Sequence, residues 1–199
     1  MTTAASERDR LLAPVNLIVA GSERLLAEAK TSVAARIVLD LRKIHDAGRR
    51  LHRMVIELGG GPGGEGPLRP GAVRHELNNA LNHVLGYSEL LREDEDATPL
   101  APDLGRIAAA ARAARARVTL GVTSAAPAPP EPPAPLAEAS PPAGGSVLVV
   151  DDDPGNRDLV TRCLSPHGHE VLAMEHGRWA LEILKAERVD VILLDLAMP

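Results

Sequence analysis

The chain has 199 residues, of which 45% are apolar and 25% are charged, and its formal net charge is −5. This charge gives no general attraction to nucleic acid or to anionic lipid, so we expect neither as a partner. The sequence holds no phenylalanine, one tryptophan and one tyrosine. Any core must therefore be built from Leu, Val, Ile and Ala, which suits helix seams and parallel strands.

The expected localisation follows from features that the sequence lacks. No apolar run approaches the roughly 20 residues that a bilayer span needs, and the N-terminus lacks the basic start and apolar stretch of a secretory signal. The lone cysteine, Cys163, excludes an internal disulfide and is compatible with a reducing compartment. We therefore expect a cytoplasmic chain that does not enter a membrane, with Cys163 as a small buried apolar group.

Two shifts in composition divide the chain. Residues 59–71 read GGGPGGEGPLRPG, which cannot hold a helix because glycine adds backbone entropy and proline removes hydrogen-bond donors. Residues 124–145 are rich in Pro and Ala and are typical of a semi-extended spacer. These two linkers leave three candidate structured segments, 5–58, 72–123 and 146–199.

The first two segments carry the same helical pattern twice. Apolar or small residues follow steps of four, three, four and three in two candidate helices 66 residues apart, namely Leu11, Val15, Ile18, Ser22 and Leu25, and Leu77, Leu81, Val84, Ser88 and Leu91. The next helices match at an offset of 63 residues. Leu41, Ile44, Gly48, Leu51 and Val55 correspond to Leu104, Ile107, Ala111, Ala114 and Val118. Each segment is thus predicted to be a helical hairpin, and a lone hairpin cannot cover its apolar stripes. We expect a four-helix bundle, formed either within one chain or between two chains as a homodimer.

The third segment alternates strand-like and helix-like stretches. The predicted elements are a strand at 146–150, a helix at 156–164, a strand at 169–174, a helix at 179–185 and a strand at 189–194. This order is the beginning of a doubly wound parallel sheet, in which ligands bind at the carboxyl ends of the strands. Three strands leave one side of the sheet unpaired, so we expect an incomplete domain, with Trp179 packed on the sheet. The predicted fold class is α plus α/β.

Acidic residues follow two of these predicted strands. Asp151 and Asp152 come directly after the first strand, and Asp195 follows the third. Parallel strands would bring the three carboxylates together, where their charges repel one another. A hard divalent cation such as Mg²⁺, which prefers oxygen ligands, relieves that repulsion and can neutralise a phosphoryl group moving onto a carboxylate. The sequence therefore predicts a magnesium site at this edge.

The segments VLVVDDDPGNRDLV, GHEVLAMEHGRWALEIL and DVILLDLAMP resemble the first half of a response-regulator receiver domain, which has a flavodoxin-like fold. The resemblance implies that Asp195 is the phosphoacceptor and attacks phosphorus as a nucleophile. It implies that Asp152 is a direct Mg²⁺ ligand, that Asp151 is the other member of the acidic pair, and that the carbonyl of Ala197 is a backbone ligand. The family's later hydroxyl residue and lysine have no counterpart in 146–199, so the resemblance implies a truncated receiver domain.

A second candidate centre lies in the helical stretch RHELNNALNHVLGYSELL. His75 and Asn79 are one helical turn apart, and Glu76 adjoins the histidine. A neutral imidazole nitrogen is a competent nucleophile toward phosphorus when a carboxylate accepts the proton on its other nitrogen. A zinc site would need a second histidine where Asn79 stands, so HELNN fails the HExxH pattern. By itself such a histidine is more often an ordinary surface residue.

This stretch resembles the phosphoacceptor helix in the dimerisation and histidine-phosphotransfer hairpin of sensor histidine kinases. The resemblance covers 72–123 and implies that His75 is the phosphoacceptor, with Glu76 as its acid/base partner. It also implies that Asn79 orients water for dephosphorylating a partner aspartate. The first hairpin resembles the same module, but Asp9 stands where the histidine would fall and an arginine follows it. That copy is predicted to be chemically silent.

A histidine kinase also needs an ATP-binding domain, and only spacer sequence lies between residues 122 and 146, so we do not expect this chain to phosphorylate His75 by itself. We expect a two-component phosphorelay protein in which His75 exchanges phosphate with Asp195 or with a partner's aspartate, using Mg²⁺. Its expected partner is a cognate histidine kinase or receiver protein. One alternative is the regulatory N-terminal part of a larger signalling enzyme, a hybrid histidine kinase or nucleotide cyclase, truncated at Pro199. Another is a non-enzymatic dimerisation scaffold.

Overall fold

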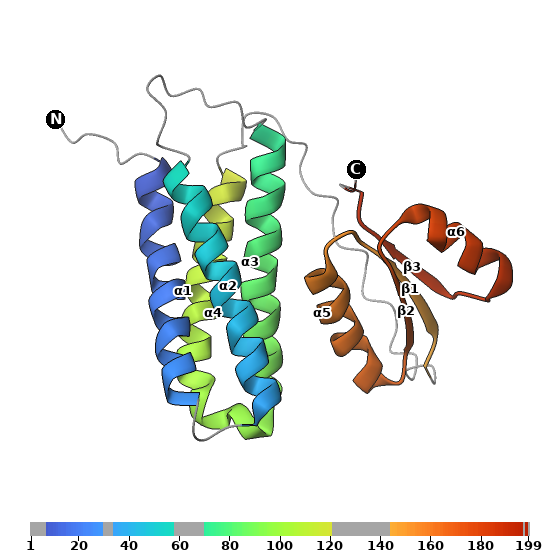
Figure 1. Cartoon of the computed structure of the whole chain (residues 1–199), viewed down its shortest axis with the longest axis horizontal. Helices are drawn as coiled ribbons and strands as arrows, with labels where there is room; N and C mark the ends of the chain where they lie inside the picture. Colours follow the sequence, from blue (N-terminus) through green and yellow to red (C-terminus); the bar gives the residue numbers. More distant parts are fainter. Residues whose placement is uncertain (1–6, 30–33, 58–69, 121–143, 197, 199) are drawn as a thin grey trace, which may run out of the picture. The chain divides into compact units, whose positions relative to one another are not determined.

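A computed structural model describes residues 7–29, 34–57, 70–120, 144–196 and 198 of the chain (Figure 1). The chain divides into two compact units, Met1–Ser124 and Ala125–Pro199. The first is helical and the second is an α/β unit, which confirms the predicted fold class. Within the described residues, no helix is both long enough and apolar enough to span a bilayer.

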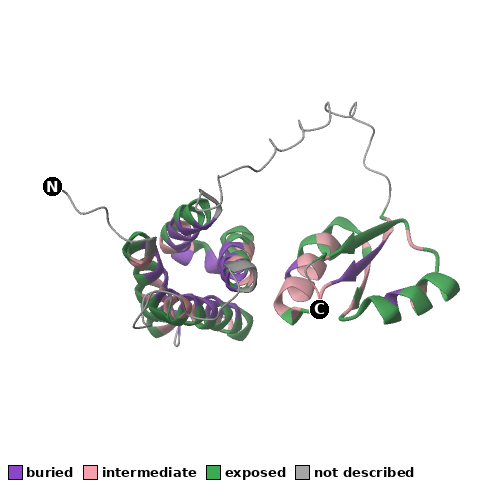
Figure 2. Ribbon diagram, turned by 90° about the horizontal axis from the view of Figure 1, so that it is seen from above, coloured by how far each residue is buried: buried purple, intermediate pink, exposed green. Residues whose placement is uncertain are grey.

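The first unit contains four long helices and a short 3₁₀ helix. They are α1 (Glu7–Ala29), α2 (Ala35–Glu57), α3 (Pro70–Glu93), η1 (Glu95–Leu100) and α4 (Ala101–Leu120). Helix α1 packs against α2 and α4, and α3 packs against the same two helices. Seen from above, the four helices surround a buried interior (Figure 2). The two hairpins therefore contact each other within a single chain.

The apolar seams that the sequence predicts form this interior. All twenty seam positions are buried, including the serines Ser22 on α1 and Ser88 on α3. Helices α1 and α2 approach closely at Gly48, where an added Cβ would lie 2.9 Å from Ile18 Cγ2. Burial at the seams is the main stabilising term, because apolar area removed from water contributes about 25 cal/mol per Å².

Charged side chains join the two hairpins at the end of the bundle where α1 and α3 finish. Arg24 on α1 pairs with Asp103 on α4. Arg36 on α2 pairs with Asp94, the N-cap of η1, through an Nη2–Oδ1 distance of 2.8 Å, and with Asp96 at the same distance. These arginines are about half exposed, so solvent screens the pairs and each adds little to stability.

The second unit contains a three-stranded sheet. Its elements are β1 (Ser146–Val150), α5 (Pro154–Leu164), η2 (Ser165–His167), β2 (Glu170–Met174), α6 (Gly177–Ala186) and β3 (Val191–Leu194). The strand order is β2-β1-β3 and both pairings are parallel, with Val150 opposite Met174 on one side and Leu194 on the other. The predicted alternation of strands and helices is confirmed, with element ends within about two residues of the expected positions.

The core of this unit is small and lies around the central strand. Leu148 and Val150 on β1 pack with Ala180 on α6. All four residues of β3 are exposed, by 42–52%.

Two side-chain predictions in this unit are wrong. Trp179 is 59% exposed and does not pack on the sheet, and Cys163 is exposed rather than buried. Ala180 is the buried residue of α6 and Leu159 the buried residue of α5. Each helix thus buries one residue fully, with Ile183 of α6 partly buried against the same core, and other apolar side chains stay in solvent because no other described segment covers them.

Candidate functional site

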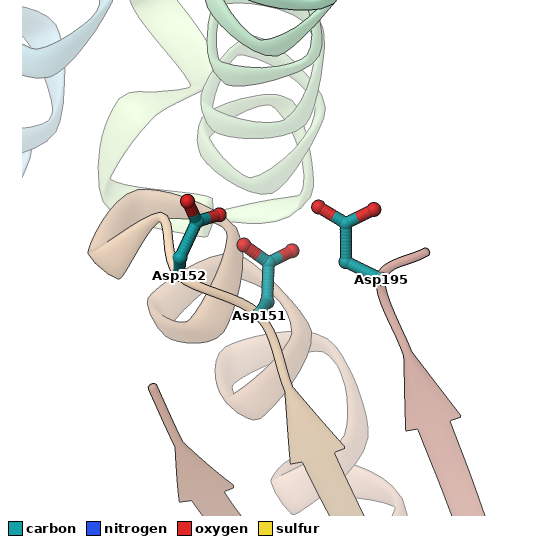
Figure 3. Close-up of side chains that lie close together, drawn as sticks. All are labelled: Asp151, Asp152 and Asp195. Atoms are coloured by element: carbon teal, nitrogen blue, oxygen red, sulfur yellow. The ribbon is translucent and has the colours of Figure 1, made fainter. Parts of the chain in front are cut away.

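Three carboxylates meet at the carboxyl edge of the sheet. Asp151 and Asp152 follow β1, and Asp195 follows the adjacent strand β3 (Figure 3). One oxygen from each side chain lies within 4.8 Å of the others. The parallel pairing of β1 with β3 produces this convergence, since both strands end at the same edge. The predicted meeting of the three acidic residues is therefore present in the structure.

Backbone hydrogen bonds hold two of these residues at the strand ends. The amide of Asp195 donates to the carbonyl of Val150 at 2.9 Å, which continues the pairing one residue beyond β3. The amide of Asp151 donates to the carbonyl of Met174 at 3.1 Å, and its side chain accepts from the amide of Asp153 at 2.8 Å. Asp151 and Asp195 are partly buried and Asp152 is exposed. The cluster is thus fixed by the sheet on one side and open to solvent on the other.

The neighbouring Asp153 has a different role, although it continues the acidic run. Its side chain is the N-cap of α5 and accepts from the amides of Gly155 at 2.7 Å and Asn156 at 3.3 Å. Such a cap satisfies donors that the first helical turn leaves unpaired. Arg157, one turn into α5, donates from Nη1 to the carbonyl of Asp151 at 2.6 Å. Sequence reasoning did not single out Arg157, because a side-chain contact to a backbone carbonyl leaves no motif.

Partial burial raises the pKa of Asp151 above its usual value, and the nearby charges of Asp195 and Asp153 raise it further. The hydrogen bond from the Asp153 amide opposes this rise. Ionised together, the carboxylates of the cluster repel one another, and a divalent cation would relieve that repulsion. In proteins Mg²⁺ keeps several water ligands and binds one or two carboxylates directly. The three carboxylate groups of the cluster offer enough oxygen ligands, and their open solvent access leaves room for the waters. The donor set therefore fits a magnesium ion. Ala197, the predicted backbone ligand, lies outside the described residues.

Replacing Asp151 with asparagine should stabilise the second unit at neutral pH when divalent cations are chelated. A carboxyl group with a raised pKa stabilises the fold while it is protonated, and this contribution is lost as the pH rises through the folded pKa. Asparagine cannot ionise, so the variant should melt above the parent at pH 7 and close to it in acid. Fluorescence of Trp179, the single tryptophan, follows this unit during thermal unfolding.

The same substitution removes one carboxylate from the cluster, so Mg²⁺ should raise the melting temperature of the parent more than that of the variant. An Asp151→Asn protein that melts below the parent at neutral pH without Mg²⁺ would contradict the assigned effect of burial. The matched substitution Asp158→Asn on α5 leaves the cluster intact and should show neither effect.

The second predicted centre lies on α3 in the helical unit. His75 is partly buried, and its Nε2 lies 3.0 Å from the side-chain nitrogen of Asn79, one turn along the helix. With that amide as the donor, Nε2 is the ring nitrogen that carries a lone pair. Glu76 is exposed, and among the described residues it makes no hydrogen bond with His75. The structure therefore brings Asn79 to the histidine but not Glu76.

The N-terminal hairpin offers no matching centre. Asp9 occupies the position on α1 that corresponds to His75 in the repeat, and Pro14 lies inside the same helix. Arg117 on α4 donates to the carbonyl of Arg10 on α1, so this end of α1 is held against α4. The first hairpin supplies packing surface to the bundle.

Comparison with known proteins agrees with the geometry of the second unit. Residues 147–199 match the sequence model of the response regulator receiver domain. Protein PilH of Pseudomonas aeruginosa is 40% identical over 53 residues, which are 27% of this chain and 44% of PilH. Response regulator MprA of Mycolicibacterium vanbaalenii is 42% identical over 53 residues, which are 27% of this chain and 23% of MprA.

A sensor protein also matches. Sensor protein GacS of Pseudomonas syringae pv. syringae is 39% identical over 66 residues, which are 32% of this chain and 7% of GacS. The chain thus spans less than half of the length of these curated relatives. No solved structure matches the chain significantly.

The parallel sheet and its acidic edge define a receiver-type unit, the class of module that occurs in two-component signalling. Residues 147–199 in particular carry the sequence of a response regulator receiver domain. This part of the predicted resemblance is confirmed. The resemblance of 72–123 to a histidine-kinase hairpin stays a prediction.

Proposed function

We propose that the chain takes part in a phosphorelay, with Mg²⁺-dependent phosphoryl transfer between His75 and a receiver aspartate, Asp195. The observation that carries this proposal is the convergence of three carboxylates within 4.8 Å at the carboxyl edge of a receiver-type sheet. The contact between His75 and Asn79 supports the other half of the reaction. The donor of the phosphoryl group to His75 would be a cognate histidine kinase.

The transfer step needs no oxidant and no further reactant. The bond between phosphorus and the imidazole nitrogen of phosphorylated His75 breaks, and its electron pair returns to the nitrogen. A carboxylate oxygen of Asp195 forms the new bond to phosphorus, which leaves neutral histidine and an aspartyl phosphate. The reverse step returns the phosphoryl group to the histidine.

Residues around the two acceptors would serve this step in different ways. Asp151 and Asp152 would hold Mg²⁺ beside Asp195, and the bound ion would neutralise charge on the phosphoryl oxygens. The side-chain amide of Asn79 donates a hydrogen bond to His75 Nε2 and so occupies the lone pair of that nitrogen. Asn79 must therefore turn away before Nε2 attacks phosphorus. Once turned, its amide can orient a water for hydrolysis. Glu76, exposed next to His75, would take the proton from the other ring nitrogen when its side chain moves toward the ring.

A second candidate function is that both units regulate a larger signalling enzyme, such as a hybrid histidine kinase or a nucleotide cyclase. The observation that favours it is the match to a sensor protein, of which this chain spans only 7%. In that case phosphorylation would act on an attached output, and the same acceptors would be used. A pure dimerisation scaffold would instead carry no phosphate at either residue.

The proposal is tested with two full-length variants that separate donor from acceptor. An Asp195→Asn chain is labelled on His75 with phosphoramidate, purified, and mixed with a His75→Ala chain. With Mg²⁺, label should pass to the His75→Ala chain and change from acid-labile to alkali-labile, whereas with a chelator it should stay on the donor. Retention of all label on the donor in the presence of Mg²⁺ would refute the proposed transfer.

A further inference from the structure

Helix α1 contains a proline in its interior, at Pro14. Proline has no backbone N–H, so the carbonyl of Arg10, four residues earlier, lacks the hydrogen bond that an α-helix normally gives it. The side chain of Arg117 on α4 donates from Nη1 to this same carbonyl. A guanidinium from the second hairpin thus takes the place of the backbone amide that the first hairpin lacks.

The internal repeat provides a comparison within the same bundle. At the repeat offsets, Pro14 corresponds to Ala80 on α3, and Arg117 corresponds to Met54 on α2. Ala80 keeps its N–H in the interior of α3, so the carbonyl of Glu76 needs no donor from another helix. The thioether of Met54 could not supply one. The freed carbonyl and its donor therefore occur together where α1 meets α4, whereas Ala80 and Met54 provide neither where α2 meets α3.

A second polar contact distinguishes the same two interfaces. Arg24 on α1 pairs with Asp103 on α4, near the other end of α1. The repeat counterparts are Leu90 on α3, which cannot form an ion pair, and Asp40 on α2, which pairs with Lys43 of its own helix. The interface of α1 with α4 thus has two polar contacts, one toward each end, that the repeat counterparts cannot reproduce. The apolar seams, in contrast, are buried in both hairpins.

We propose that Pro14 and Arg117 form a matched pair through which the first hairpin recognises the second hairpin rather than another copy of itself. In a bundle of two first hairpins, Met54 would lie opposite the freed carbonyl and could not donate to it. In a bundle of two second hairpins, Arg117 would lie opposite a carbonyl that its own helix already satisfies. Only the pairing of unlike hairpins matches donor to acceptor. This pairing places one His75 in each bundle, and it goes beyond the proposed function because it holds whether or not that histidine accepts phosphate.

A matched pair of this kind makes the effects of two substitutions depend on each other. Removing the guanidinium of Arg117 leaves the carbonyl of Arg10 without a donor from the protein, which costs stability. When alanine replaces Pro14, a backbone amide can bond that carbonyl, so the loss of Arg117 matters less. Substitutions that act on one hydrogen bond are therefore non-additive, whereas substitutions at independent sites add.

The test is a double-mutant cycle in the full chain, with thermal unfolding followed by circular dichroism. Most helical residues lie in the bundle, so its unfolding dominates the helix signal. Arg117→Met removes the donor but keeps an apolar side chain, and it should lower the melting temperature of the parent by about 3 °C. In a Pro14→Ala chain the same substitution should lower the melting temperature by less than about 1 °C.

The matched control is Arg112→Met on the same helix. Arg112 pairs with Glu89 on α3 and not with α1, so its substitution should shift the melting temperature equally in the parent and in the Pro14→Ala chain.

Equal shifts for Arg117→Met in the two backgrounds would overturn the proposal, because Arg117 would then not act on the carbonyl that Pro14 frees. The same shifts would be expected if like hairpins paired in solution, since α4 would not face α1. An Arg112→Met control with the same non-additivity would also overturn it, because the dependence on residue 14 would then be a general property of α4.

Discussion

A His75→Ala chain is expected to lose acid-labile phosphate when it is incubated with phosphoramidate or with a cognate histidine kinase. The substitution removes the ring whose Nε2 lone pair faces Asn79, so no nucleophile remains at this position of α3. Loss of a nucleophile removes the covalent step itself, and labelling should fall by at least about 100-fold. Phosphate on the intact chain is measured by its stability in alkali and its loss in acid.

The control for this prediction is His52→Ala. His52 is a partly exposed histidine on α2, so the control removes an imidazole from the same unit. Its labelling should match that of the parent. Equal acid-labile phosphate on the His75→Ala chain and the parent would show that another histidine is the acceptor.

An Asp195→Asn chain is expected to take up no phosphate from acetyl phosphate in the presence of Mg²⁺. The amide that replaces the carboxylate is a poor nucleophile, and it also removes one charge from the cluster that would hold the ion. Labelling should fall by at least about 100-fold and is measured as alkali-labile phosphate. Since the backbone amide of Asp195 makes the hydrogen bond to Val150, the substitution should leave the end of β3 in place.

Asp190→Asn is the matched control, because Asp190 precedes β3 and its side chain accepts from the amide of Ser146 at 2.9 Å. An asparagine oxygen can keep that bond, so labelling should be unchanged. If the Asp195→Asn chain still gained alkali-labile phosphate at the parent level, the acceptor would have to be Asp151, Asp152 or a residue outside the cluster.

The helical seams were predictable because burial on a helix repeats with the helical period. Leu81 and Val84, for example, are one seam step apart and both are buried. Whether the two hairpins pair within one chain or between two could not be predicted, because the same apolar stripes satisfy both arrangements. In the structure, contacts such as Arg24 with Asp103 join the hairpins within one chain.

The acidic cluster was predictable for a related reason. Parallel strands end at one edge, so Asp151 and Asp195 had to come close once the strands were assigned. The capping role of Asp153 could not be predicted from the run of three aspartates, because the backbone geometry decides which carboxylate caps α5. The exposure of Trp179 could not be read from periodicity either, because a pattern locates a helix face but not the amount of chain that covers it.

Strand β3 combines apolar side chains with an outer edge that is unpaired among the residues that the structure describes. Val191 and Leu194 are both about half exposed, and β3 ends the strand order β2-β1-β3, so no described strand pairs with its outer side. An apolar strand with unpaired amides and carbonyls is a template for pairing with another chain. Concentrated solutions of this chain should therefore tend to form sheet-extended aggregates, and a strand that occupies the outer edge of β3 should suppress them.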